Sequence, residues 1–169
     1  MLKSPGNSLP LFMPPLPHPR HILLADDDKD DSLLFRDVFA ALFLPVHLTT
    51  LYNGEQLMQL LNGKEPLPDI LFLDLNMPRI NGLECLSEIK HTEKLQGLPV
   101  IIFSTSCEPA VVDLLYKNGA QYYIRKPNNF GDLKKVIYQA LVLTSSTHIA
   151  QPSRERFVLS PQPVKNESN

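Results

Sequence analysis

Acidic residues stand where the chain leaves apolar segments. Asp26 and Asp27 follow the run His21–Ala25, and Asp74 follows the run Ile70–Leu73. Three carboxylates that share a pocket repel one another, so a proton or a cation must relieve the repulsion. Hard oxygen ligands suit Mg²⁺, which keeps several waters and takes one or two carboxylates together with phosphate oxygens. These acids therefore indicate a Mg²⁺ site that handles phosphate.

A serine and a lysine follow two later apolar runs. Ser104 ends the run that starts at Val100, and Lys126 comes shortly after Tyr122–Ile124. The ammonium could neutralise one acid and later hold a phosphate oxygen, and the hydroxyl could donate from the other side. This set fits phosphoryl transfer, because that reaction is catalysed mainly by positioning and charge neutralisation. The nucleophile would be an aspartate carboxylate.

The elements that must position these residues alternate along the chain. Apolar runs typical of buried strands lie at residues 21–25, 46–51, 70–73, 100–103 and 122–124. Helical spacing of apolar residues follows at 32–42, 55–61, 83–90, 110–118 and 133–143. Five strand–helix units predict an α/β fold, a doubly wound five-stranded parallel sheet with five helices. In the flavodoxin-like order 2-1-3-4-5, the first and third strands are neighbours, so their acids would share a pocket.

Other residues near these positions have a simpler interpretation. Asp28, Asp30 and Asp31 are interpreted as helix caps and solvent-facing acids, with Asp30 or Asp31 as the cap of the first helix. Tyr122 and Tyr123 point to opposite faces of a strand, so one is expected in the core and the other exposed.

Proline usage divides the chain into three parts. Six of the sixteen prolines lie in residues 1–20, and three more lie in 152–163. We therefore expect a Pro-rich flexible N-terminal extension at 1–20, a domain at 21–146 and a flexible tail at 147–169. The residues after Leu143 show no pattern for a DNA-binding output domain.

Charge and hydropathy narrow the class of protein. The net charge is −2, which argues against a nucleic-acid-binding module because such modules usually carry a basic patch. No stretch is apolar enough to span a membrane, and prolines interrupt the apolar N-terminal residues that a signal peptide would need. We expect a cytoplasmic protein without membrane partners.

Four segments together resemble the receiver domains of bacterial response regulators, of the single-domain CheY-like type. They are ILLADDD (22–28), ILFLDLNMPRINGLE (70–84), LPVIIFSTS (98–106) and GAQYYIRKP (119–127). Their order and spacing match that family from about His21 to Leu143.

The resemblance implies a role for each matching position. Asp74 resembles the phosphoacceptor, Asp27 the direct metal ligand and Asp26 the acid that acts through water. The main-chain carbonyl of Asn76 resembles the third protein ligand of Mg²⁺.

The remaining matches concern the switch. Ser104 and Tyr123 fall on the family's two switch positions, and Lys126 on its lysine. The peptide bond between Lys126 and Pro127 resembles one that is usually cis in the family.

By this resemblance the chain is a stand-alone response regulator of a two-component system or phosphorelay, a signalling domain and not an enzyme. It would take a phosphoryl group from a sensor histidine kinase or a histidine phosphotransfer protein, and act on a downstream protein target. A homodimer through the 110–143 face is one form that this output could take.

Two alternatives remain open at this stage. A haloacid-dehalogenase-type phosphatase also uses a strand-end aspartate and Mg²⁺, but it needs a second acid two residues later, where Asn76 stands. A degenerate receiver that serves only as a binding module usually lacks an acid or the lysine. Asp26, Asp27, Asp74 and Lys126 are all present.

Overall fold

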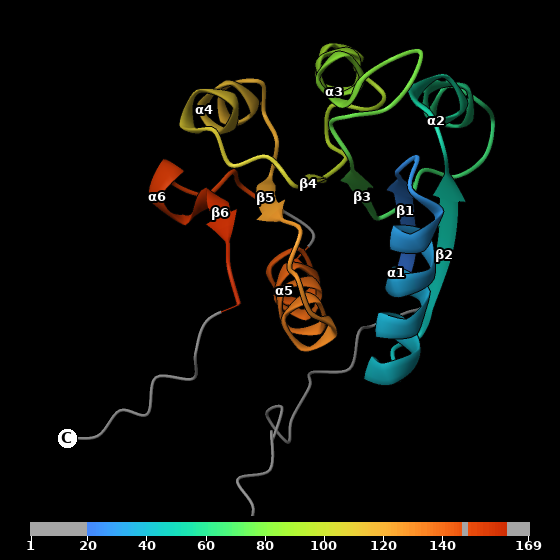
Figure 1. Ribbon diagram of the computed structural model, residues 1–169. Coiled ribbons are helices and arrows are strands. Elements are labelled where there is room, and N and C mark those ends of the chain that lie inside the picture. Colours follow the sequence, from blue (N-terminus) through green and yellow to red (C-terminus); the bar gives the residue numbers. More distant parts are fainter. Residues whose placement is uncertain (1–19, 147–148, 162–169) are drawn as a thin grey trace, which may run out of the picture.

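The computed structural model describes residues 20–146 and 149–161, so the expected N-terminal extension lies outside the described residues apart from Arg20. One parallel sheet has the order β2-β1-β3-β4-β5-β6 (Figure 1). Its strands are β1 (Arg20–Ala25), β2 (Val46–Leu51), β3 (Ile70–Leu73), β4 (Val100–Ser104), β5 (Tyr122–Arg125) and β6 (Val158–Leu159). The α/β class and the order 2-1-3-4-5 are confirmed. The prediction of five strands is wrong, because a sixth strand pairs with β5.

Helices cover both faces of the sheet. They are α1 (Lys29–Leu42), α2 (Gly54–Leu61), α3 (Gly82–His91), α4 (Pro109–Lys117), α5 (Phe130–Leu143) and α6 (Arg154–Phe157). Figure 1 shows α2, α3 and α4 on one side of the sheet and α1 and α5 on the other, with α6 beside α4. None of the helices in the described ranges is long and apolar enough to cross a membrane.

Strand residues alternate between two hydrophobic clusters. In β3, Leu71 and Leu73 pack on the α2–α3–α4 side, whereas Ile70 and Phe72 pack on the α1–α5 side. Phe35 of α1 stands at the centre of the second cluster, with its ring centroid 5.1 Å from that of Phe72 in an edge-on contact. Burial of both strand faces explains the unbroken apolar runs in the sequence.

Helix α1 begins close to the carboxyl end of β1. Its N-cap is Asp28, whose carboxylate accepts a hydrogen bond from the backbone N–H of Asp30 at 2.9 Å. The prediction that Asp30 or Asp31 would be the cap is therefore wrong. The helix starts three residues earlier than its apolar spacing indicates, which brings its first turn to the carboxyl ends of the strands.

Helix α3 begins against the backbone at the end of β3. Gly82 donates its N–H to the carbonyl of Leu75 at 3.0 Å. A Cβ atom at this position would lie 2.2 Å from the carbonyl oxygen of Asp74, a distance that real Cβ atoms do not reach. Only glycine allows the helix to start this close to Asp74.

The segment after α5 returns to the sheet as α6 and β6. Phe157 is fully buried, with its ring centroid 5.1 Å from that of Tyr116 and 6.4 Å from that of Tyr123. β6 pairs in parallel with β5 through Tyr123↔Val158 and Ile124↔Leu159. Within the expected C-terminal tail, residues 154–159 thus form a short helix and a short strand.

Polar contacts hold the same segment to α4 and β5. The side-chain amide of Gln151 donates to the carbonyls of Tyr116 at 2.7 Å and Ala120 at 2.9 Å. Arg154 forms an ion pair with Asp113 of α4 at 2.6 Å. Residues 149–159, named here the C-terminal segment, are therefore packed against α4 and β5.

The C-terminal segment also explains the burial of two tyrosines. Tyr122 and Tyr123 are both buried, although they point to opposite faces of β5. The expectation that one of them would be exposed is wrong, because β5 is an interior strand and Phe157 covers the Tyr123 face.

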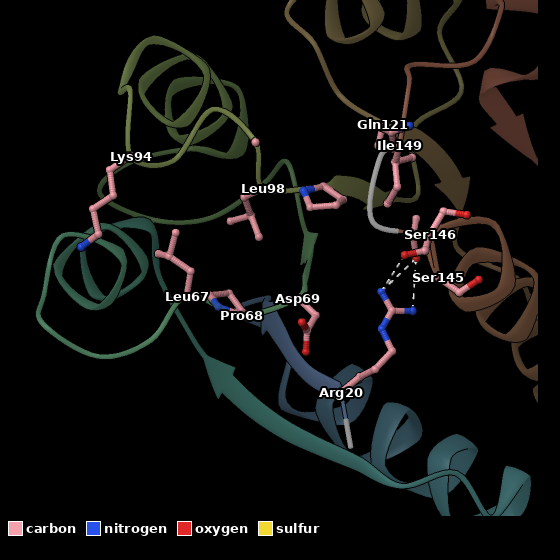
Figure 2. A pocket seen from close by; sticks show the side chains of 13 residues that line it. Arg20, Leu67, Pro68, Asp69, Lys94, Leu98, Gln121, Ser145, Ser146 and Ile149 are labelled. Carbon is pink, nitrogen blue, oxygen red and sulfur yellow. Dashed lines mark hydrogen bonds between the residues drawn. The ribbon is translucent and has the colours of Figure 1, made fainter. Parts of the chain in front are cut away.

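A buried arginine lies at the end of the sheet where β1 begins (Figure 2). Arg20, at the start of β1, donates hydrogen bonds to the carbonyls of Leu141 at 2.9 Å and Thr144 at 3.0 Å. A cation that pairs with the last carbonyls of a helix stabilises its C-terminus. This contact fixes the end of α5 to β1, beside a cavity of about 420 Å³.

Candidate functional site

The ends of β1 and β3 bring three acids together. The strands are neighbours in register, with Ala25 opposite Leu73, and the N–H of Asp74 donates to the carbonyl of Ala25 at 2.9 Å. Carboxylate oxygens of Asp26, Asp27 and Asp74 lie within 4.8 Å of one another. The pocket is thus formed by the strand order, since parallel neighbours end at the same side of the sheet.

The three acids differ in burial. Asp26 has no exposed surface and Asp74 is 5% exposed, whereas Asp27 faces solvent. One oxygen of Asp26 accepts the N–H of Asp28 at 2.9 Å. The other oxygen, Oδ2, receives no well-directed hydrogen bond from the described residues. A buried carboxylate oxygen in this position is available to a cation.

Burial makes ionisation of the two inner acids less favourable. It raises the pKa of Asp26 to about 8, and the neighbouring carboxyls of Asp31 and Asp74 add to the rise, while the N–H of Asp28 and the charge of Lys126 oppose it. Burial also raises the pKa of Asp74, against the opposing effect of Lys126. A pocket in which like charges and desolvation act together favours binding of a cation.

Lys126 is the cation already present in this pocket. Its Nζ lies 2.7 Å from Asp31 Oδ2, 3.1 Å from Asp26 Oδ2 and 3.6 Å from Asp74 Oδ1. Burial lowers its pKa, but the hydrogen bond to Asp31 and the charges of Asp26 and Asp74 outweigh that effect, so its pKa is raised above the ordinary value. Lys126 is therefore an ammonium at neutral pH.

Asp31 was missed by the sequence analysis as part of this site. Its interpretation as a cap or solvent-facing acid is wrong, because its side chain is 16% exposed and holds the tightest contact of Lys126. The sequence feature that could have identified Asp31 is its position in the first turn of α1, because this helix starts at the carboxyl ends of the strands. Asp28 is the cap, and Asp30 is exposed, as expected for such residues.

Ser104 and Tyr123 approach one another through the loop after β4. Ser104 is fully buried, and its hydroxyl accepts the N–H of Ser106 at 3.3 Å. The Tyr123 hydroxyl donates to the carbonyl of Ser106, and burial raises its pKa, which keeps this hydroxyl protonated. The ring of Tyr123 points inward in this structure and contacts Phe157.

Asn76 and the peptide bond between Lys126 and Pro127 were also singled out in the sequence. Asn76 lies in the loop after β3 with an exposed side chain, beside the cavity of about 510 Å³ between this loop and α4. The peptide bond between Lys126 and Pro127 is trans, since the described residues contain no cis peptide bond. The expectation of a cis bond is wrong here, and the trans isomer is the ordinary preference of such bonds.

The chain is similar to known response regulators in sequence and in fold. Response regulator Rcp1 of Synechocystis sp. is 33% identical over 124 residues, which are 70% of this chain and 84% of that protein. The crystal structure of the phosphorylated cyanobacterial phytochrome response regulator RcpA is similar with a TM-score of 0.71 at 30% identity, covering 80% of this chain and 99% of that one. The Mn²⁺-bound form of Rcp1 gives a TM-score of 0.69 at 31% identity, covering 80% of this chain and 100% of that one.

A family model also matches most of this chain. The model of the response regulator receiver domain matches residues 22–138, a range that begins in β1 and ends in α5. It includes Asp26, Asp27, Asp74, Ser104 and Lys126. On this match, together with the fold and its relatives, the chain belongs to the response regulator receiver domain family.

Proposed function

We propose that this protein is a stand-alone response regulator that takes a phosphoryl group onto Asp74. The observation that carries the proposal is the position of Asp74, at the end of β3 with Lys126 Nζ at 3.6 Å and the carboxylates of Asp26 and Asp27 beside it. The donor would be a phosphohistidine of a sensor kinase or a histidine phosphotransfer protein, the usual partners of receiver domains. The chain would be a signalling domain whose only chemistry is its own phosphorylation and dephosphorylation.

The proposed reaction forms one bond and breaks another. A carboxylate oxygen of Asp74 attacks phosphorus, the P–N bond of the phosphohistidine breaks, and the electron pair leaves with the imidazole. Lys126 stays protonated and can pair with a phosphoryl oxygen. Ser104 supplies a hydroxyl at the neighbouring strand end, where it can donate to another of these oxygens.

The residues of the pocket fit Mg²⁺. It would be held by Asp27, Asp74 and the main-chain carbonyl of Asn76, with Asp26 acting through a bound water. The buried Oδ2 of Asp26, which receives no well-directed hydrogen bond from the described residues, and the all-oxygen donor set support this assignment. The Mn²⁺-bound structure of Rcp1 is a further support, since it concerns a relative of the same family. When bound, the ion supplies positive charge against the phosphoryl oxygens.

Output would pass through contacts with a downstream protein. The 110–143 face was proposed from the sequence as the surface of a partner or a second copy. The C-terminal segment lies over part of that face, with β6 on the side of β5 and Phe157 against Tyr116 and Tyr123. A partner or a second copy would therefore contact the outer surface of this segment together with α4 and α5, or displace it.

The test is labelling by a small phosphodonor in the presence of Mg²⁺. We expect one acid-labile phosphoryl group per chain of the wild type and none on Asp74→Asn. Asp37→Asn is the matched control, because it removes an exposed acid of α1 outside the pocket. Persistent labelling of Asp74→Asn would refute the proposal. Turnover of many equivalents of donor would favour the phosphatase alternative, and no labelling of the wild type would favour the binding-module alternative.

A further inference from the structure

Lys126 is closer to a residue outside the acid cluster than to the proposed phosphoacceptor. Its Nζ lies 2.7 Å from Asp31 Oδ2 but 3.6 Å from Asp74 Oδ1. The Lys126 and Asp31 side chains are 15% and 16% exposed, so water competes only partly for this contact. Charge-assisted hydrogen bonds of this length are among the strong ones in proteins.

The fold fixes Asp31 in place. It lies in the first turn of α1, whose N-cap is Asp28 and whose next turn is packed into the core by Phe35. Lys126 is fixed at its backbone, where its N–H donates to the carbonyl of Ser104 at 2.9 Å. The most mobile part of this ion pair is thus the long Lys126 side chain, whose ammonium can move between Asp31 of α1 and Asp74 at the end of β3.

We propose that Asp31 is a positioning residue that holds Lys126 on the α1 side of the pocket until a phosphoryl group arrives, and so sets how strongly the site takes that group. The proposal rests on the proposed function of Asp74 and names a residue that regulates the same site.

The physical reason is competition for one cation. A phosphoryl group adds about −1.5 to −2 charges next to Lys126 at neutral pH. To pair with this group, Lys126 must leave Asp31, which leaves the Asp31 carboxylate without its partner. The loss of that contact makes phosphorylation less favourable than in a pocket without Asp31.

The experiment is titration of the intact chain with beryllofluoride and Mg²⁺, a stable mimic of the aspartyl phosphate. The chain has no tryptophan, so calorimetry or fluorine NMR serves as readout. We expect Asp31→Asn to bind about fivefold more tightly than the wild type, a change of about 1 kcal/mol. Asp30→Asn is the matched control, because it removes the same charge from the same turn at an exposed position. It should bind like the wild type.

A double-mutant cycle shows whether the effect passes through Lys126. In a Lys126→Ala background, Asp31→Asn should change the affinity by less than about twofold, as expected from additivity of uncoupled sites. Asp31→Glu should restore the wild-type affinity, since it restores the carboxylate. The Nζ resonance of Lys126 in the metal-free protein should shift in Asp31→Asn and stay in place in Asp30→Asn.

The outcomes separate this inference from the proposed function. Absence of binding in the wild type, or binding that persists in Asp74→Asn, would refute the proposed function itself. Normal binding in the wild type with equal or weaker binding in Asp31→Asn would overturn the role of Asp31 alone. That role would also be overturned if Asp30→Asn tightened binding as much as Asp31→Asn, or if the effect of Asp31→Asn survived in Lys126→Ala.

Discussion

Three carboxylates contact one ammonium at the carboxyl ends of the strands, and a fourth carboxylate lies beside them. Asp26, Asp31 and Asp74 each lie within 3.6 Å of Lys126, whereas Asp27 lies outside its reach and faces solvent. Without a metal ion, Asp27 contributes repulsion to the pocket and gains no partner there among the described residues. This difference makes Asp27 the residue whose effect on stability should depend most on Mg²⁺.

Asp27→Asn should raise the free energy of unfolding of the metal-free protein slightly, by about 0.5 kcal/mol, because it removes one of several like charges. Asp27→Asn should also reduce the stabilisation that Mg²⁺ adds, because a ligand stabilises a protein in proportion to how tightly it binds the folded state. Urea denaturation with and without saturating Mg²⁺ measures both effects. Asp37→Asn is the control, and equal stabilisation by Mg²⁺ in Asp27→Asn would contradict its assignment as a ligand.

The residue types of the site could be recognised from the sequence, but their contacts could not. Asp26, Asp27 and Asp74 are found because each follows an apolar strand, and strand order alone brings them together. The contact of Asp31 with Lys126 depends on where α1 begins and how it is turned. Acids in the first turn of a helix are usually explained by capping, so the sequence offers no reason to separate Asp31 from Asp30.

The elements of the sheet differ in how clearly the sequence marks them. β2 and β3 have the bounds that the apolar runs predict, because four to six apolar or β-branched residues form a distinct pattern. Helix starts are less distinct, as α1 and α5 begin three residues before their apolar spacing. β6 has two residues, which is too short for any alternation, and only tertiary pairing with β5 makes it a strand.

Phe157 is the main apolar anchor of the C-terminal segment. Phe157→Ala should lower the free energy of unfolding by about 3 kcal/mol, because it leaves a cavity in the core. If the C-terminal segment detaches before the rest of the domain unfolds, the loss should be smaller and equal to the free energy that holds the segment in place. Val158→Ala is the matched control, because the neighbouring side chain is 41% exposed and its loss should cost little. Hydrogen exchange of the β5 amides should speed up in Phe157→Ala only. Unchanged exchange and stability would mean that the segment is held by its polar contacts.

At the scale of the whole molecule, one line of contacts joins the acid pocket to the C-terminal segment. Ser104 accepts the N–H of Ser106, the carbonyl of Ser106 accepts the Tyr123 hydroxyl, and the ring of Tyr123 contacts Phe157. A shift of Ser104 toward a phosphoryl group would therefore disturb the loop that holds Tyr123. Such a side-chain element with two arrangements is what a switch requires.

Beryllofluoride with Mg²⁺ should change hydrogen exchange and chemical shifts at Ser104, Tyr123, α4 and the C-terminal segment. The physical reason is that a few charge-assisted hydrogen bonds of about 1.5–3 kcal/mol each can bias such an element. Asp74→Asn under the same conditions is the control. If the changes stay at Asp26, Asp27 and Asp74, the protein does not switch this face and would serve as a phosphate sink or relay.

The pairing of β6 with β5 also bears on solubility. Without β6, the Tyr-Tyr-Ile run of β5 would form the outer boundary of the sheet and present unpaired N–H and C=O groups to other chains. Exposed edge strands of this kind promote pairing between copies and aggregation. Natural proteins protect them with short edge strands or with covering segments. β6 does both, because it covers β5 and offers only two residues of its own as a template.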